Sequence, residues 1–233
     1  MLQASRTWVA AVAEHTIGLM IDVARGILRA NIAYKSGLHP SIGMGTQLKG
    51  STAGIIGYGP LGQRMAQLCD AFGMRLLICD PYVRVVNSRF APVGLHPLLQ
   101  QSDFVLLLAA ATEETENLIG TAQLAAMKRT AVLVNVSRGN LVDEAALLQA
   151  LDAGRLAGAA LDVGRAPDQM PSADLVRRPD VTGTPHIAGL TQPAIEGQAI
   201  ETVAQAIEIL AGHVPEGAVN AGAASRMNRV PLA

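Results

Sequence analysis

Residues 50–62 read Gly-Ser-Thr-Ala-Gly-Ile-Ile-Gly-Tyr-Gly-Pro-Leu-Gly, and this stretch decides the fold. A short apolar run ends in three glycines with the spacing G-x-G-x-x-G, and apolar residues at helical spacing follow them. A second apolar run, 76–79, then ends on Asp80. Strand, glycine turn, helix, strand and terminal acid in this order are typical of the βαβ unit that binds a dinucleotide.

Each glycine of this fingerprint has its own task. We expect Gly57 to form the tight turn, Gly59 to let the backbone approach a pyrophosphate, and Gly62 to let the helix pack close to the strand. The helix N-terminus faces the phosphate charge. A bare structural turn is the alternative to this nucleotide site. The residues predicted to contact the cofactor here are Gly57, Tyr58, Gly59, Pro60, Leu61 and Gly62.

Asp80 indicates which dinucleotide binds. Its carboxylate ends the second strand, where it can accept a hydrogen bond from a ribose 2′-hydroxyl and repel a 2′-phosphate. The predicted cofactor is therefore NAD rather than NADP. Arg84 argues the other way, because an arginine just beyond the acid can accommodate the extra phosphate.

The composition excludes some classes of function. The chain has 233 residues, a formal net charge of −1 and 3% aromatic residues. Neither the charge nor the aromatic content suits a nucleic-acid-binding protein. Cys69 and Cys79 fall on a helical face and inside a strand, where they predict small buried thiols rather than a disulfide or a metal site. Reduced cysteines indicate the cytoplasm.

The residues from 8 to 28 are mostly apolar and predict one long helix. Glu14, His15, Asp22 and Arg25 interrupt the run, and a membrane span would tolerate these side chains poorly. The helix is too apolar to face water. We therefore expect it to be buried or to form an interface between two copies of the chain.

Beyond the fingerprint, the chain alternates between apolar runs and helical patterns. Runs such as 104–108 are apolar throughout, which is typical of strands buried on both faces of a parallel sheet. A last helix begins after Thr191 and ends at Gly212, and its apolar stripe predicts one buried face. The sequence thus predicts an α/β fold with a doubly wound parallel sheet of Rossmann type and flanking long helices. The expected strands are 53–56, 75–79, 103–108, 131–136, 158–163 and 181–183, and the expected central helices are 60–72, 95–101, 121–127 and 143–153.

Polar residues collect where the predicted strands end, and ligands of open parallel sheets bind at that edge. Thr112 follows the third strand, and Ser137 and Arg138 follow the fourth. Asp162 ends the fifth strand and His186 follows the last. One crevice could hold all of these side chains, so we expect an active site there.

Several ordered motifs resemble those of the D-isomer-specific 2-hydroxyacid dehydrogenases, and the likeness runs from about Ala11 to Asn220. The resemblance implies hydride exchange between NAD and a small 2-keto or 2-hydroxy acid. It also implies a homodimer with the first helix at the two-fold contact. Besides the fingerprint, the motifs are Ala13-Glu14-His15-Thr16, Asn135-Val136-Ser137-Arg138-Gly139, Val142-Asp143-Glu144, Leu161-Asp162-Val163 and Thr184-Pro185-His186-Ile187-Ala188-Gly189.

The same resemblance implies roles for single residues, each with a plain structural role as its alternative. Arg138 would bind the substrate carboxylate and carbonyl oxygen, for which a guanidinium offers paired donors. His186 would donate a proton to the carbonyl oxygen. Asp162 would contact the nicotinamide carboxamide, and Thr112 would contact the cofactor. The remaining implied cofactor contacts are Val136, Ser137 and Gly189, with Arg138 and His186 also close to it.

The acid that pairs with the histidine in this family would fall at position 167. That residue is Pro167, with Asp168 beside it. A carboxylate next to a histidine favours the imidazolium and fixes the ring, and proline can do neither. Two possibilities remain open: Asp168 replaces the acid from a shifted loop and joins the catalytic set, or His186 works without a carboxylate.

Family members also carry a substrate-domain segment before the first helix, and this chain starts almost at that helix. We expect an NAD-binding domain with its interface helix at 4–190, a helix returning to the substrate domain at 191–220, and a tail at 221–233. The pocket for the substrate side chain draws on the preceding segment. The sequence therefore does not name the acid.

Three hypotheses about function remain. Arg138 and His186 favour an NAD-dependent oxidoreductase. Pro167 and the short N-terminus favour an NAD-binding or interaction module without turnover, or a truncated fragment of such an enzyme. A nucleotide-binding protein of another class, such as a methyltransferase, would leave Arg138 and His186 without a role.

Overall fold

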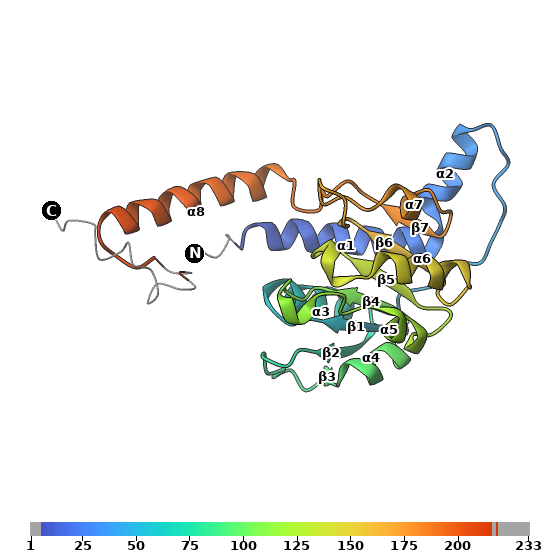
Figure 1. Ribbon diagram of the computed structural model, residues 1–233, viewed down its shortest axis with the longest axis horizontal. Coiled ribbons are helices and arrows are strands. Elements are labelled where there is room, and N and C mark those ends of the chain that lie inside the picture. The colour runs from blue at the N-terminus through green and yellow to red at the C-terminus, as the bar shows by residue number, and fades with distance from the viewer. Residues whose placement is uncertain (1–5, 216–217, 219–233) are drawn as a thin grey trace. The chain divides into compact units, whose positions relative to one another are not determined.

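A seven-stranded sheet forms the core of residues 12–188 (Figure 1). The computed structural model describes residues 6–215 and 218, so the predicted tail at 221–233 lies outside the described residues. The strand order is β3-β2-β1-β4-β5-β6-β7, and every pairing is parallel. The predicted doubly wound α/β fold is confirmed. The strands are β1 (Thr52–Ile56), β2 (Arg75–Cys79), β3 (Ala91–Pro92), β4 (Phe104–Leu107), β5 (Val132–Asn135), β6 (Gly158–Leu161) and β7 (Val181–Gly183).

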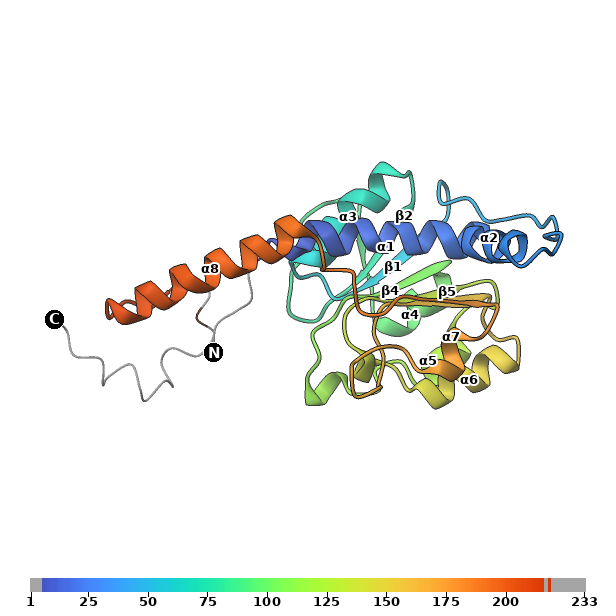
Figure 2. The same ribbon diagram turned by 90° about the horizontal axis from the view of Figure 1, so that it is seen from above.

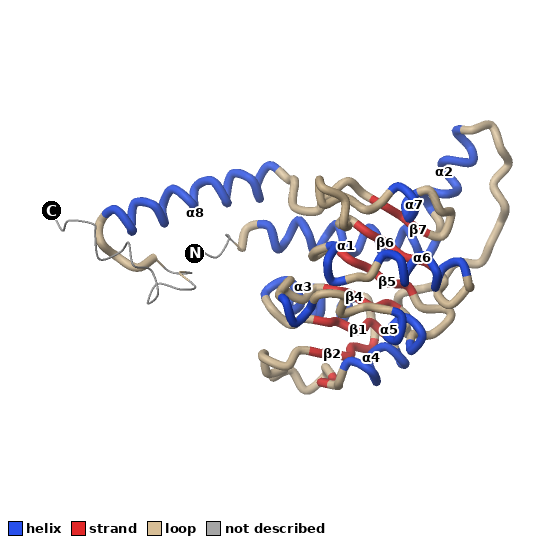
Figure 3. The backbone as a smooth tube through the Cα atoms, in the orientation of Figure 1, coloured by secondary structure: helices blue, strands red, loops and turns tan. Residues whose placement is uncertain are grey.

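Helices cover both faces of this sheet, as Figures 2 and 3 show. α4, α5 and α6 pack side by side on one face, and α3 lies on the other face with the part of α1 that follows residue 12. The helices are α1 (Trp8–Arg25), α2 (Ile27–Lys35), α3 (Pro60–Ala71), α4 (Leu95–Gln101), α5 (Thr121–Ala126), α6 (Glu144–Asp152), α7 (Ala173–Val176) and α8 (Gln192–Leu210), with short 3₁₀ turns η1 (Glu113–Thr115) and η2 (Gly139–Leu141).

The central strands are buried from end to end. All residues of β1, β4, β5 and β6 are buried, as the uninterrupted apolar runs predict. The sequence predicts three strands two residues too long: 103–108 and 131–136 overrun β4 and β5 by one residue at each end, and 158–163 runs two residues past β6. β3 was missed. It has two residues, one of them a proline, which suits the edge position it occupies.

The prediction of one helix from 8 to 28 is wrong, because the helix breaks at Gly26. This residue has φ +64°, in the left-handed region, and α2 begins directly after it. Asp22 stabilises the break: its Oδ1 accepts the Leu28 backbone N–H at 2.6 Å, and its Oδ2 accepts the Thr182 hydroxyl at 2.6 Å. The end of α1 is thereby tied to β7.

The chain divides into two compact units. One comprises residues 12–188 and contains the whole sheet, and the other comprises the described parts of 1–11 and 189–233. In the second unit α8 begins after Thr191, and Gly212 follows it with φ +81°, as predicted. Within the described residues, nothing buries the apolar stripe of α8, so its predicted burial stays a prediction. Its members Ile195, Val203, Ile207 and Leu210 each expose more than half of their surface.

None of the helices in the described residues combines the length and the hydrophobicity needed to cross a bilayer.

Candidate active site

The glycine turn between β1 and α3 has a geometry that suits a phosphate. Gly57 has φ +96°, and a Cβ built on it would lie 2.6 Å from the backbone of Ala109. A Cβ on Gly62 would lie 2.1 Å from the Gly57 carbonyl oxygen, so glycine permits the close packing of helix on strand. At Gly59 a Cβ would meet nothing within 4 Å. The backbone there faces open space at the N-terminus of α3, which fits a pyrophosphate.

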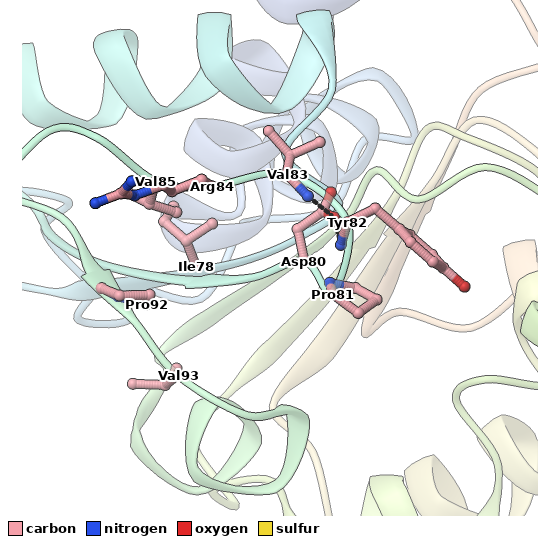
Figure 4. Close-up of a pocket in the computed structure, with 9 residues that line it drawn as sticks. All are labelled: Ile78, Asp80, Pro81, Tyr82, Val83, Arg84, Val85, Pro92 and Val93. Carbon is pink, nitrogen blue, oxygen red and sulfur yellow. Dashed lines mark hydrogen bonds between the residues drawn. The ribbon is translucent and has the colours of Figure 1, made fainter.

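A cavity of about 450 Å³ lies beside this turn, after β2 (Figure 4). Asp80 forms part of its wall, and three backbone N–H groups hold the carboxylate. Oδ1 accepts from Tyr82 at 2.8 Å and Val83 at 2.9 Å, and Oδ2 accepts from Tyr58 at 2.6 Å. An ionised carboxylate has about four lone-pair positions, so Oδ2 keeps one for a ribose hydroxyl. The Tyr82 ring and the Arg84 side chain extend in opposite directions from the loop (Figure 4).

The loops after β2 and β4 are tied together. The Tyr82 hydroxyl donates to Glu114 Oε2 at 2.7 Å, and this bond raises the pKa of Tyr82 above its usual value. Glu114 lies in η1, whose first turn is capped by Thr112 and Thr115. Thr112 is exposed at this point, beyond the end of β4.

Arg138 follows β5 in a segment that side chains hold in place. We call residues 137–142 the arginine segment. The buried Asn135 accepts the Ser137 N–H at 3.1 Å and donates to the Arg138 carbonyl at 2.9 Å. The Ser137 hydroxyl donates to the carbonyl of Ala109 at 2.7 Å. Within the described residues, the exposed Arg138 guanidinium donates only to the Ser137 carbonyl. Its other N–H groups remain for a ligand carboxylate.

His186 follows β7 in an uncommon backbone conformation. Its φ is +54°, a left-handed value that costs energy for a residue with a Cβ. Its backbone N–H donates to the Asp162 carbonyl at 2.9 Å. The ring is half-buried, and no hydrogen bond or ion pair joins it to another described residue.

The fully buried Asp162 carboxylate holds this conformation in place. We call residues 184–188 the histidine segment. Oδ1 accepts the Thr184 hydroxyl at 2.6 Å and the Ile187 N–H at 2.9 Å, and Oδ2 accepts the Ala188 N–H at 3.0 Å. The segment thus wraps around one carboxylate. The side chain of Asp162 consequently offers almost no surface to a ligand.

His15 also belongs to this network, although the sequence analysis assigned it no role. Its Nε2 lies 3.0 Å from the Thr184 hydroxyl oxygen and 3.6 Å from Asp162 Oδ1. Since the Thr184 proton goes to Asp162, the hydroxyl oxygen must accept from His15, which places a proton on Nε2. The motif around His15 is visible in the sequence, but only the folded structure places His15 next to the end of β7.

Asp168 makes a different contact from the one proposed for it. Its Oδ1 accepts the Met170 N–H at 3.0 Å in a loop that closes through a Gly164–Gln169 backbone bond. No hydrogen bond or ion pair joins Asp168 to His186 within the part of the chain that the structure describes. The replacement of the absent acid by Asp168 therefore stays a prediction.

Because the strands are parallel, their C-terminal ends meet at one edge of the sheet, which we call the strand-end edge. The glycine turn, Asp80, Thr112, Arg138 and His186 follow strands there. Val136 is buried directly after β5, and Gly189 begins the C-terminal part of the second unit. Cys69 and Cys79 are free thiols; burial raises the pKa of Cys69 to about 12 and that of Cys79 above its usual value.

The chain matches the family model described as D-isomer specific 2-hydroxyacid dehydrogenase, NAD binding domain, over residues 17–188. The D-3-phosphoglycerate dehydrogenase of Methanocaldococcus jannaschii is 36% identical over 217 residues, which are 90% of this chain and 41% of that protein. The chain thus spans about two fifths of that relative's length.

Solved structures show the same fold. The D-lactate dehydrogenase of Aquifex aeolicus, in complex with NAD and lactic acid, superimposes with a TM-score of 0.79 at 28% identity, over 88% of this chain and 67% of that one. An acyclic imino acid reductase in complex with NADPH and D-Arg gives a TM-score of 0.81 at 31% identity, over 89% of this chain and 66% of that one.

Proposed function

Because this chain belongs to the D-isomer-specific 2-hydroxyacid dehydrogenase family, we propose that its protein is an NAD-dependent oxidoreductase of 2-hydroxy acids. The reaction is reduction of a small 2-keto acid and its reverse. One observation carries the proposal: Arg138 and His186 lie at the strand-end edge that also holds the glycine turn. A nucleotide site, a carboxylate-binding cation and a proton donor are the parts that this reaction requires.

The residues divide the work as follows. Free N–H groups of Arg138 bind the substrate carboxylate and the carbonyl oxygen, and their positive charge polarises the carbonyl. Bound NAD(H) gives or accepts the hydride. His186 holds a proton at a ring nitrogen and donates it to the carbonyl oxygen during reduction, and takes one back in the reverse direction. Asp162 keeps the histidine segment in its conformation.

The cofactor would lie along the same edge. N–H groups at the start of α3 would bind the pyrophosphate, and Oδ2 of Asp80 would bind the ribose. Thr112, Val136 and Ser137 would line the path toward the nicotinamide. This arrangement supports a preference for NADH over NADPH, because the Asp80 carboxylate repels a 2′-phosphate.

The test compares two substitutions. Arg138→Ala should abolish reduction of 2-keto acids while leaving NADH affinity nearly unchanged, because Arg138 addresses the substrate. His186→Ala should lower the rate by about 10²–10⁴-fold. If neither variant affected a measurable keto-acid reductase activity, the enzyme hypothesis would fail and an NAD-binding module would replace it.

Asp168 has its own test. If this residue pairs with His186, Asp168→Asn should narrow the pH range of reduction on its alkaline side, because a negative charge that favours the imidazolium is lost. An unchanged pH profile would mean that His186 works without it.

We further propose a cytoplasmic homodimer in which α1 and α2 form the contact, with residues 191–220 packing on a substrate domain. Ile27, Leu28 and Ile32 support the contact, since they are exposed apolar side chains on neighbouring turns. The two reduced cysteines support the compartment. A monodisperse monomer at micromolar concentration in sedimentation velocity would contradict the dimer.

A further inference from the structure

Arg165 lies at the centre of a hydrogen-bonded cluster beside the arginine segment. Its Nε donates to the Val142 carbonyl at 2.9 Å, and Nη2 lies 2.8 Å from both Glu116 Oε1 and the Asn140 carbonyl. Nη2 also contacts the side-chain oxygen of Asn117. One guanidinium therefore serves two carbonyls of the arginine segment and two side chains of the loop after η1.

Two further bonds close this cluster. Asn140 Nδ2 donates to the second oxygen of Glu116 at 2.8 Å, and the Arg165 backbone N–H donates to Glu144 Oε1 at 2.8 Å. The Arg165 guanidinium and the Asn140 amide hold the pKa of Glu116 below its usual range. The carboxylate is therefore ionised at neutral pH, and the ion pair is intact.

The backbone next to Arg165 also packs closely against the arginine segment. A Cβ built on Gly139 would lie 2.0 Å from the carbonyl oxygen of Gly164, so the two loops touch where Arg138 ends and Arg165 begins. On the other side, the Asn135 side chain holds the Arg138 carbonyl. The exposed Arg138 guanidinium thus extends from a backbone that is fixed on both sides.

Arg165 also starts the loop that carries Asp168. That loop closes on itself through the backbone bond from Gly164 to Gln169. Arg165 thus bonds to the arginine segment through its side chain, while its backbone begins the loop that carries Asp168.

Arg178 shows what a purely structural arginine of this chain looks like. It bonds to Asp180 at 2.9 Å and to Asp152, at the opposite edge of the sheet where β7 begins. Both arginines are partly exposed and pair with at least one carboxylate, but only Arg165 adjoins the candidate active site. Arg178 is therefore a matched control.

We propose that Arg165, paired with Glu116, is a positioning residue that holds the arginine segment so that Arg138 meets the substrate carboxylate. The proposal rests on the proposed function, because Arg138 is the residue being positioned. A planar guanidinium with donors in two directions can serve both carbonyls and the carboxylate, and lysine cannot reproduce this geometry.

The test compares Arg165→Met, Arg165→Lys and Arg178→Met in the full chain. Arg165→Met should raise KM for the 2-keto acid by about 10–100-fold, the cost of a displacement near 1 Å. It should lower kcat less and leave NADH affinity unchanged. Arg165→Lys should fall between it and the wild type, because lysine keeps the charge for Glu116 but loses the bond to Val142. Arg178→Met should leave KM unchanged.

Amide hydrogen exchange gives a readout that needs no turnover. Arg165→Met should speed exchange at Asn117, Leu141 and Val142, whose N–H groups are bonded within the cluster. Arg178→Met should leave these amides unchanged. Unchanged exchange and KM in Arg165→Met, or equal changes in both variants, would overturn the proposal.

Failure of the proposed function would look different. Suppose that the wild type reduced no 2-keto acid, while Arg165→Met still exchanged the Asn117, Leu141 and Val142 amides faster. The cluster would then still hold the arginine segment, and the proposed substrate class would be wrong. If the wild type were active and Arg138→Ala inactive while Arg165→Met resembled the wild type, the positioning role would fall and the function would stand.

Discussion

The two halves of the strand-end edge hold their polar groups in different ways. In the half that follows β1, β2 and β4, the groups that would face a nucleotide are backbone N–H groups and one carboxylate. Glycine conformations shape this half. In the half that follows β5, β6 and β7, Arg138 and His186 extend from segments that side chains hold, namely Asn135 for one and Asp162 for the other.

The two halves should therefore respond to different kinds of amino-acid substitution. A surface built from backbone tolerates polar substitutions nearby and fails when a Cβ is added. A surface held by side-chain hydrogen bonds keeps its volume after an isosteric substitution and fails when one acceptor is lost. The nucleotide half should therefore respond chiefly to added bulk. The catalytic half, in which Gly139 also packs closely on Gly164, should in addition respond to a single changed atom.

The largest effect is expected at Gly62. In Gly62→Ala the new Cβ would meet the Gly57 carbonyl, and helix and strand must move apart. The free energy of unfolding should fall by about 3 kcal/mol, as for overpacked sites. Urea unfolding measures this, and NADH affinity should fall with it.

Gly59→Ala is the matched control for that variant. Its Cβ would enter open space, so stability should hold while NADH binding weakens. If Gly62→Ala were as stable as the wild type, the turn would not depend on close backbone packing, and the proposed difference between the two halves would be wrong.

Asp162 tests the other half. In Asp162→Asn the amide can still accept from Thr184 and Ile187 through its oxygen, but its NH₂ would face the Ala188 N–H. An acceptor becomes a donor, so we expect the free energy of unfolding to fall by about 2 kcal/mol. Because the histidine segment loosens, kcat should fall while NADH affinity holds.

The opposite outcome for Asp162→Asn is equally informative. A fall in NADH affinity with kcat little changed would show that Asp162 contacts the cofactor, as the resemblance implies. It would also mean that Asp162 is not needed to hold the histidine segment in its active conformation.

The sequence predicts the geometry of the nucleotide half better than that of the catalytic half, because the contacts of the catalytic half join residues far apart in the chain. The turn at Gly57 depends on residues that are neighbours in sequence, so its spacing alone predicts its geometry. The bond between His15 and Thr184 joins positions 169 residues apart, and local patterns contain no trace of such a pair. The Arg165 cluster was missed likewise, because its partner Asn117 lies 48 residues away.

The long N-terminal helix failed as a prediction for a related reason. Its residues are mostly apolar from 8 to 28, and this pattern does not reveal that Asp22 can cap a second helix. That capping depends on the Thr182 hydroxyl from β7, which holds the other oxygen of the carboxylate. Glycine at position 26 is the one local sign of the break.

A smaller effect is expected for cofactor preference. Asp80→Ala should narrow the preference for NADH over NADPH by about 10-fold, since the charge that repels a 2′-phosphate is removed. Arg84→Ala should act in the opposite direction and lower NADPH affinity alone. Fluorescence titration with both cofactors measures each change. Equal affinity of the wild type for NADH and NADPH would contradict the assignment of Asp80.

The smallest effect concerns Glu116 and pH. Arg165 and Asn140 hold the pKa of this carboxyl below its usual range, so the folded state favours its ionised form. The stability that it contributes is therefore fully present above the unfolded pKa, and is lost as the pH falls through the folded pKa.

Glu116→Gln removes this contribution and leaves a side chain of similar size. The variant should unfold at lower urea concentration than the wild type at pH 7, and the difference should shrink as the pH falls through the folded-state pKa of Glu116, which lies below the usual value of the group. Because Glu116 is exposed, the difference at neutral pH should be small and should shrink with added salt. A difference that stayed constant with pH would mean that the Glu116 charge adds nothing to the cluster, and that Arg165 acts on the arginine segment through its bonds to the Val142 and Asn140 carbonyls.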